Sequence, residues 1–187
     1  MSCLIANGRQ EVCKDTVGGL KNIYFINYGI GSTHTSITYD ATNTDLITAI
    51  DGISTLYKFE LKGANTFDQV VTSSRENGTT FVQQTLSIQL KNQDVATTKN
   101  VKLLAYGRPH VVVQNNAGQY FLAGLERGLD LTTGNINNGA SLADFNGYQL
   151  TFVGEEKIPA NFLDCTTEAE LATLFATSGI DATIVNS

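Results

Sequence analysis

The fold is decided by one stretch in the middle of the chain, FDQVVTSSRENGTTFVQQTLSIQL, which occupies residues 67–90. The dipeptide Asn77-Gly78 near its centre suits a tight type I′ turn and is the strongest short-range signal for a hairpin. On the return strand, Leu86 and Ile88 share one face because side chains alternate along a strand. The stretch therefore predicts one long antiparallel hairpin.

The outer half of this hairpin offers no apolar face on which a core can form. Its inner half carries Val70 and Val71 opposite Val82 and Leu86, and we expect these four side chains to join the core. A two-stranded arm that packs on nothing is marginal in water. The tip is therefore either a mobile loop or an arm that a neighbouring subunit supports, and we favour the arm. The predicted oligomer-interface residues are Thr72, Ser73, Ser74, Arg75, Glu76, Asn77, Gly78, Thr79 and Thr80.

Working outward toward the N-terminus, the sequence predicts a series of short strands. Residues 1–20 show no periodicity, and we expect them to form an irregular arm. Residues 21–28 hold a dense β-branched and aromatic run, which predicts a strand buried on both faces. Two shorter strands are expected near residues 34–39 and 46–50. Residues 55–62 alternate between apolar and charged side chains, which predicts a strand buried on one face only.

Beyond the hairpin, the sequence predicts one interior helix and more strands. Residues 92–105 form the helix, with Asn92 or Asp94 as its cap and Gly107 at its end. Two strands then flank a hairpin turn at residues 115–118. The Gly/Asn-rich residues 132–146 are expected to form a loop, and residues 147–155 return to strand.

The character of the chain changes after Pro159. Thr167 and Glu170 have the spacing of a capping box, which predicts the start of a short helix. We expect the acidic segment 160–187 to dock on the β core or on a neighbour, so truncation after Ala160 should alter solubility or stacking more than the core. Residues 1–187 are read as a single domain, mainly β. The predicted fold is an antiparallel β-sandwich or barrel with one flanking α-helix, a long hairpin arm and a short C-terminal helix.

Charge is scarce and unevenly placed. Charged residues make up 16% of the chain, against about 25% in a typical soluble domain. This neutral polar surface indicates either extensive subunit contact or simply a Thr-rich β protein. Of the net charge of −6, residues 154–187 supply −5, from six carboxylates and one lysine. The sequence shows no basic patch for a phosphate backbone, which argues against sequence-specific DNA binding but is compatible with passage of DNA past the protein.

The sequence also bears on location. No apolar run approaches the length of a membrane span, and the first residues lack the order of charges typical of a signal peptide. Cys3, Cys13 and Cys165 have no metal-binding spacing and leave one thiol over under any pairing. We therefore expect synthesis in a reducing compartment.

No catalytic, cofactor-binding or metal-binding constellation is predicted. His34 and His110 are isolated and read as structural or surface residues. Cys165 precedes the predicted C-terminal helix, the one feature that favours a reactive thiol, but a small apolar residue at a helix entry is the commoner meaning. Glu155 and Glu156 are adjacent in a strand, so they point to opposite faces and cannot act as an acid/base pair.

The order of elements resembles the family of bacteriophage tail-tube and type VI secretion tube proteins. The matching parts are residues 55–62, 67–90, 92–105 and 111–155, and the resemblance covers about residues 13–160. It implies a homo-oligomeric ring, hexameric in this family, that stacks into a tube through which the genome passes. It also implies contacts with other tail proteins and a location in the virion tail after synthesis in the bacterial host cytoplasm. The acidic end of the chain is an addition to the family pattern.

Three other functions are weighed against this one. A head–tail ring protein or a head-decoration protein of a phage shares the same composition. A carbohydrate-binding β-sandwich is the next alternative, but such proteins commonly use exposed tryptophan platforms and this chain has no tryptophan. An enzyme comes last because no residue pattern supports one.

Overall fold

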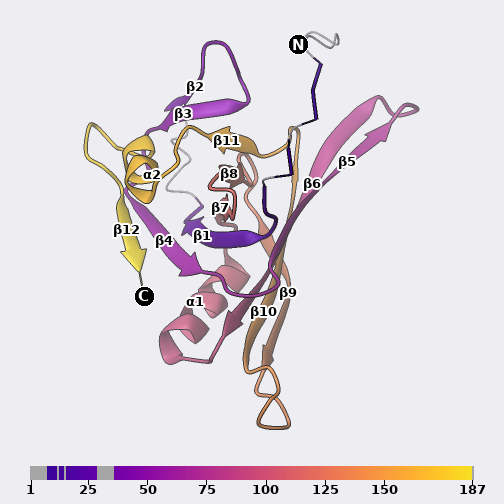
Figure 1. Cartoon of the computed structure of the whole chain (residues 1–187), viewed down its shortest axis with the longest axis vertical. Coiled ribbons are helices and arrows are strands. Elements are labelled where there is room, and N and C mark those ends of the chain that lie inside the picture. The colour runs from indigo at the N-terminus through magenta and orange to yellow at the C-terminus, as the bar shows by residue number, and fades with distance from the viewer. Residues whose placement is uncertain (1–7, 12, 15, 29–35, 187) are drawn as a thin grey trace.

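The computed structural model describes residues 8–11, 13, 14, 16–28 and 36–186, and it shows a mainly β sandwich (Figure 1). The two sheets do not close into a barrel. The described residues form twelve strands and two helices: β1 (Leu20–Ile26), β2 (Ile37–Tyr39), β3 (Leu46–Ile50), β4 (Thr55–Glu60), β5 (Thr66–Ser74), β6 (Thr79–Lys91), α1 (Val95–Tyr106), β7 (His110–Asn115), β8 (Tyr120–Ala123), β9 (Asp130–Asn137), β10 (Gly147–Glu156), β11 (Asn161–Leu163), α2 (Glu168–Leu174) and β12 (Thr183–Asn186).

The larger sheet has eight strands in the order β12-β4-β1-β7-β8-β11-β3-β2. Its centre is buried on both faces, as the sequence predicted for the first long strand. Tyr24 and Ile26 of β1 point into one hydrophobic cluster, and Ile23 and Phe25 point into a second one on the opposite face. The larger sheet is therefore the middle of three layers, with one hydrophobic cluster against each of its faces.

The smaller sheet is antiparallel throughout, in the order β5-β6-β10-β9. Leu86 and Ile88 of β6, with Leu150 and Phe152 of β10, pack across the second cluster toward the larger sheet. This is the inward stripe that the hairpin sequence predicted. The alternate residues of the same strands are mostly Thr, Ser and Gln, and they face away from the core.

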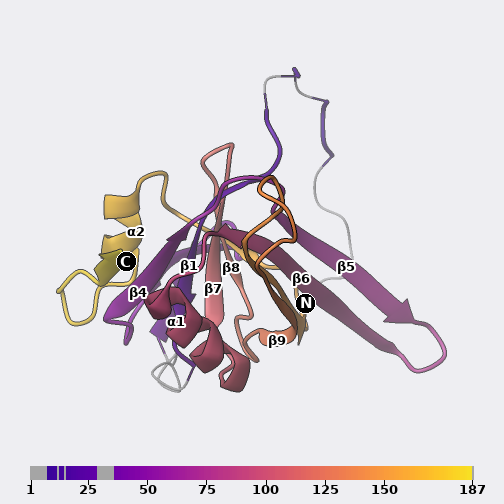
Figure 2. The same ribbon diagram turned by 90° about the horizontal axis from the view of Figure 1, so that it is seen from below.

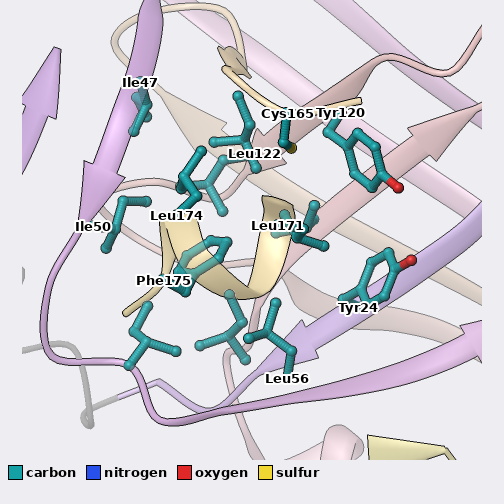
Figure 3. Packing of buried hydrophobic residues seen from close by; sticks show 14 of the residues in the cluster. Tyr24, Ile47, Ile50, Leu56, Tyr120, Leu122, Cys165, Leu171, Leu174 and Phe175 are labelled. Atoms are coloured by element: carbon teal, nitrogen blue, oxygen red, sulfur yellow. The ribbon is translucent and has the colours of Figure 1, made fainter. Parts of the chain in front are cut away.

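The C-terminal segment docks on the β core, the first of the two predicted alternatives, and it goes further than expected because it forms part of that core. Figure 3 shows Leu171, Leu174 and Phe175 in the middle of the first cluster, with the side chains of strands and loops around them. Strands β11 and β12, which the sequence did not predict, extend the larger sheet by pairing with β8 and β3 and with β4. The helix begins with the predicted capping box between Thr167 and Glu170.

Helix α1 forms where the sequence predicted a helix, but few of its side chains pack against the rest of the molecule. The Asp94 side chain caps it by accepting a hydrogen bond from the backbone N–H of Thr97. Val101 is its one buried residue, and Leu104 packs partly against the second cluster. The helix ends at Gly107, as expected.

Two expectations prove wrong, the first of them in part. Residues 132–146 were expected to be loop, which is right for residues 138–146 but wrong for the first part. Asp130–Asn137 form β9, because pairing with β10 outweighs the weak strand propensity of Gly and Asn. Residues 55–62 were expected to be buried on one face. Instead Leu56 packs into the first cluster and Leu61 into the second, since the sheet here has a layer on each side.

Candidate assembly interface

The hairpin arm stands out from the body of the molecule, on the side away from α2 (Figure 2). Strand pairing runs to its end, from Thr66 opposite Ser87 to Ser74 opposite Thr79. Of the nine predicted interface residues, 72–80, all but Ser74 are exposed. The hydroxyl oxygens of Ser73 and Thr80 lie 3.0 Å apart across the arm. The tip is thus a built, paired element with nothing of its own chain packed on it among the described residues.

The turn lies where the sequence placed it but has a different form. Four residues, 75–78, connect Ser74 to Thr79, and the Asn77 N–H donates to the Ser74 hydroxyl oxygen over 3.2 Å. A type I′ turn requires positive φ at both central residues. Gly78 meets this condition, with a φ of 62°, but the φ of Asn77 is not positive. The tight two-residue turn is therefore wrong, and the hairpin has a four-residue loop.

Val70 and Val71 do not join the core as expected. Their exposed fractions are 55% and 62%, whereas Val82, opposite Val71, is only 2% exposed. Strand β6 has β10 on its other side as far as the pair of Val82 and Glu156, but β5 is an edge strand without such cover. The arm therefore presents two apolar side chains, one on each face, close to its base.

Both edges of the smaller sheet are long and unpaired within the described chain. β5 has nine residues and pairs with β6 alone, and β9 has eight and pairs with β10 alone. Proteins usually protect such edges with lysine, proline or short strands, because open edges pair with other chains. Here each strand has a single charged residue, Asp68 or Asp130, and neither contains proline. These edges are suited to pairing with another chain.

The outward face of the smaller sheet is polar and has few charges, most of them negative. Its residues alternate with the buried stripe and include Thr85, Ser87, Gln89, Gln149 and Thr151. The strand register also puts Asp68, Asp130 and Glu155 on this face, because they pair with Thr85, Val153 and Gln83. Lys91 lies at its end, opposite Gly147. Three carboxylates and one lysine leave little to hold a phosphate backbone.

A buried polar cluster supports the sheet at the base of the arm. The Glu156 carboxylate accepts hydrogen bonds from the backbone N–H groups of Glu126 and Arg127, at 3.1 and 2.8 Å. Burial raises the pKa of this carboxyl, although those hydrogen bonds oppose the shift. Beside it, the Gln84 side-chain oxygen accepts a hydrogen bond from the Gly124 N–H at 2.8 Å. These contacts fix the loop between β8 and β9 against β6 and β10.

Two of the residues considered for catalysis, His110 and Cys165, are buried among other side chains. His110 is buried, its Nδ1 donates to the Gly124 carbonyl oxygen, and Tyr28 stacks on its ring. Cys165 lies in the first cluster, where burial and nearby carboxylates raise the pKa of its thiol to about 12. A reactive thiol needs a lowered pKa, so this environment opposes such a role. His34 and Cys3 lie outside the described residues.

The pair Glu155-Glu156 lies as predicted, with Glu155 exposed and Glu156 buried on the opposite face. Within the described ranges, no three His, Cys, Asp or Glu side chains gather in a way that could hold a metal ion. No helix in that part of the chain combines the length and the apolar character that crossing a membrane requires.

One element of the candidate interface was missed by sequence reasoning. The edge strand β9 contains Gly134, Asn135 and Asn137, residues that favour turns, and these hid it. A signal was present: Leu131 and Ile136 bracket the segment, and both lie on the inward side, opposite Phe152 and Tyr148. The bulge that changes the register near Thr151 disrupts the simple alternation between them.

Comparisons with known proteins leave the chain without an assigned family. No family model, no curated protein and no solved structure matches it.

Proposed function

We propose that this protein is a structural subunit that assembles through the edges of its smaller sheet, and that it forms the tail tube of a bacteriophage. The observation that carries the proposal is the pair of unprotected edges, β5 and β9, at opposite sides of one sheet. Because they are two different surfaces, contact between them is heterologous and generates a ring when the rotation closes.

The strand directions are compatible with such a ring. Neighbouring strands alternate in direction across β5-β6-β10-β9, so β5 and β9 run opposite ways. When β9 of one copy lies beside β5 of the next, the pair is antiparallel and the alternation continues from copy to copy. Their lengths of eight and nine residues are also matched. Each copy then satisfies the backbone groups that its neighbour leaves unpaired.

The dimensions fit a channel for a genome. Six copies, the number that the family resemblance implies, supply 24 strands from their four-stranded sheets. With strands about 4.8 Å apart and tilted by roughly 40°, such a barrel is on the order of 50 Å across between backbones. The polar outward face of the sheet then lines the bore. Its low charge supports passage of DNA without tight binding.

In such a ring the arm extends beyond the pairing shared with β10, so its tip must meet a neighbouring subunit. The exposed Val70 and Val71 supply apolar contact near its base. Ordering the backbone of the tip costs about 1–2 kcal/mol per residue in conformational entropy, and the tip makes little packing of its own to offset this cost. Contact with a neighbouring subunit would supply the missing stabilisation.

The arm is tested by replacing residues 74–79 with Asn-Gly, which closes the hairpin directly after Ser73 and before Thr80. We expect a folded protein that no longer forms rings or tubes, judged by size-exclusion chromatography and negative-stain microscopy. A matched control exchanges the two hydroxyl partners, Ser73→Thr with Thr80→Ser, and keeps the arm length. Tubes of normal length from the shortened variant would contradict the proposal. Loss of assembly in the control as well would show that assembly depends on the exact side chains at positions 73 and 80 and not on the length of the arm.

A further inference from the structure

Helix α1 presents an unusual mixture of side chains on its outer face. Val95, Lys99, Lys102 and Tyr106 follow one another at intervals of four, three and four residues, so they form a single stripe. Leu103 lies beside this stripe, and all five side chains are exposed. We call these five residues the lysine face. Isolated exposed apolar residues are ordinary, but three on one thinly attached helix mark a contact surface.

Lysines outnumber carboxylates on and around the lysine face. Lys91 and Lys58 line one surface cavity with Thr97 and a single carboxylate, Glu60, and the helix itself contains no acidic residue. Asp94, at the cap of the helix, lines one surface cavity with Lys99 and Lys102, and its carboxylate accepts hydrogen bonds from Thr97. Lys99 and Lys102 therefore outnumber the single carboxylate in this cavity, and the lysine face has an excess of positive charge.

The opposite end of the molecule carries the opposite charge. Figure 1 shows the turn between β2 and β3 at the upper end of the long axis and α1 toward the lower end. Asp40 and Asp45 bracket that turn, and Asp164 follows β11, which pairs with β3. Hydrogen bonds from Thr42 and Asn43 lower the pKa of Asp40 and so favour its charged form. From residue 22 to residue 57 the sequence has neither lysine nor arginine.

Apolar side chains also accompany these carboxylates. Tyr39 precedes Asp40. Phe162 is two residues before Asp164 and lies beside Asp45, because its N–H donates to the Asp45 carbonyl oxygen at 3.0 Å. Both aromatic side chains are exposed. We call Tyr39, Asp40, Asp45, Phe162 and Asp164 the acidic end. Each of the two surfaces thus combines exposed apolar area with charge of one sign.

From this complementarity we propose that the lysine face of one copy docks on the acidic end of a second copy. The contact joins different surfaces at opposite ends of the long axis, so it repeats without limit and stacks copies head to tail. It rests on the proposed function, in which edge pairing closes each ring, and it names the surfaces that join one ring to the next. Charge sets the polarity of stacking, since two lysine faces or two acidic ends repel each other.

The test reverses each surface separately. The first variant carries Lys99→Glu and Lys102→Glu, and the second carries Asp45→Lys and Asp164→Lys. Each variant alone sets like charges against each other, so we expect rings with complete loss of tubes. A third variant with all four substitutions restores complementarity, and we expect tubes to return. Circular dichroism melts establish that every variant is folded, and negative-stain microscopy measures ring formation and tube length.

A charge-neutral control, Lys99→Gln with Lys102→Gln, should shorten tubes less than reversal does. Tubes of parental length from either reversal variant, or failure of the fourfold variant to regain tubes, would overturn the stacking contact while leaving ring closure standing. A parent chain that never leaves the monomeric state would overturn ring closure and stacking together. Raising the salt from 0.05 to 0.5 M should dissociate parental tubes into rings, because screening weakens exposed charge pairs.

Discussion

The C-terminal segment and the hairpin arm each look like an addition to the core when only the sequence is known, but the structure gives them opposite roles. Both seem to be additions to a β core, one acidic and the other rich in Thr and Ser. In the structure, residues 161–186 supply two strands and the helix that fills the first cluster. Residues 72–80 instead extend into solvent, with only their own strand pairing to order them.

The difference follows from the spacing of a few apolar residues. Leu171, Leu174 and Phe175 are three and four positions apart, so a helix brings them to one side and buries all three. Val70 and Val71 are adjacent on a strand, so they point to opposite faces and form no stripe. A short stripe of the correct period is thus a better guide to burial than net charge or position near a terminus.

The largest effect is expected from truncation after Ala160. The shortened chain loses β11, α2 and β12 and leaves the first cluster open to water, so we predict that it cannot fold. This replaces the expectation from sequence that truncation spares the β core. Circular dichroism and urea titration measure the outcome. A cooperative unfolding transition in the truncated chain would contradict the prediction.

A single side chain sharpens the same comparison. Phe175 is 0% exposed, and Phe175→Ala should lower the free energy of unfolding by about 3–5 kcal/mol. Val71→Ala, in the arm, should change it by no more than about 0.5 kcal/mol. Urea unfolding of the dispersed protein gives both values. Similar losses from the two substitutions would show that the arm packs as tightly as the core.

The fold class was predictable because its signals are local. The hairpin at residues 67–90, the capped helix that became α1 and the capping box at Thr167 each depend on neighbours in sequence. Which faces are covered depends on layers that come from distant segments. Leu56 and Leu61 illustrate this, since the two clusters that bury them are filled by α2 on one side and by β6 and β10 on the other.

The candidate site was predictable only in part, for the same reason. The tip residues 72–80 were identified by their lack of apolar partners, which is a local property. The partner edge β9 was not, because Gly134 and Asn135 become strand only when β10 pairs with them. The exposure of Val71, opposite Val82, likewise depends on where β10 ends, which the sequence of the hairpin does not contain.

A smaller effect is expected at the base of the arm, where Glu156 is buried opposite Val82. Burial raises the pKa of its carboxyl in the folded state above the ordinary value of 4.5. The folded state therefore holds this proton more tightly than the unfolded state does, and the stability it contributes is lost as pH rises through the folded pKa. The variant Glu156→Gln has no carboxyl group at this position, so its stability lacks this contribution to the pH dependence.

Thermal melts of the parent and Glu156→Gln across the acidic to neutral range measure the difference. We expect the melting temperature of the variant to rise relative to that of the parent as the pH increases, whichever protein is the more stable at neutral pH. Glu155→Gln, on the exposed face, is the matched control and should show no such trend. A constant difference between parent and Glu156→Gln across the range would argue that the carboxyl titrates alike in the folded and unfolded chain.

The smallest effect on stability is expected from the arm itself. Replacing residues 74–79 with Asn-Gly removes one pair of the ladder and a four-residue loop but no buried side chain. The shorter loop also lowers the entropic cost of closing the hairpin, and this gain offsets the lost strand pairing. We therefore expect the free energy of unfolding of the dispersed protein to change by no more than about 0.5 kcal/mol. A loss above about 2 kcal/mol would mean that the tip supports the fold of its own chain. If stability is unchanged while assembly is lost, the tip serves contacts between chains, and the arm and the C-terminal segment differ in role as well as in burial.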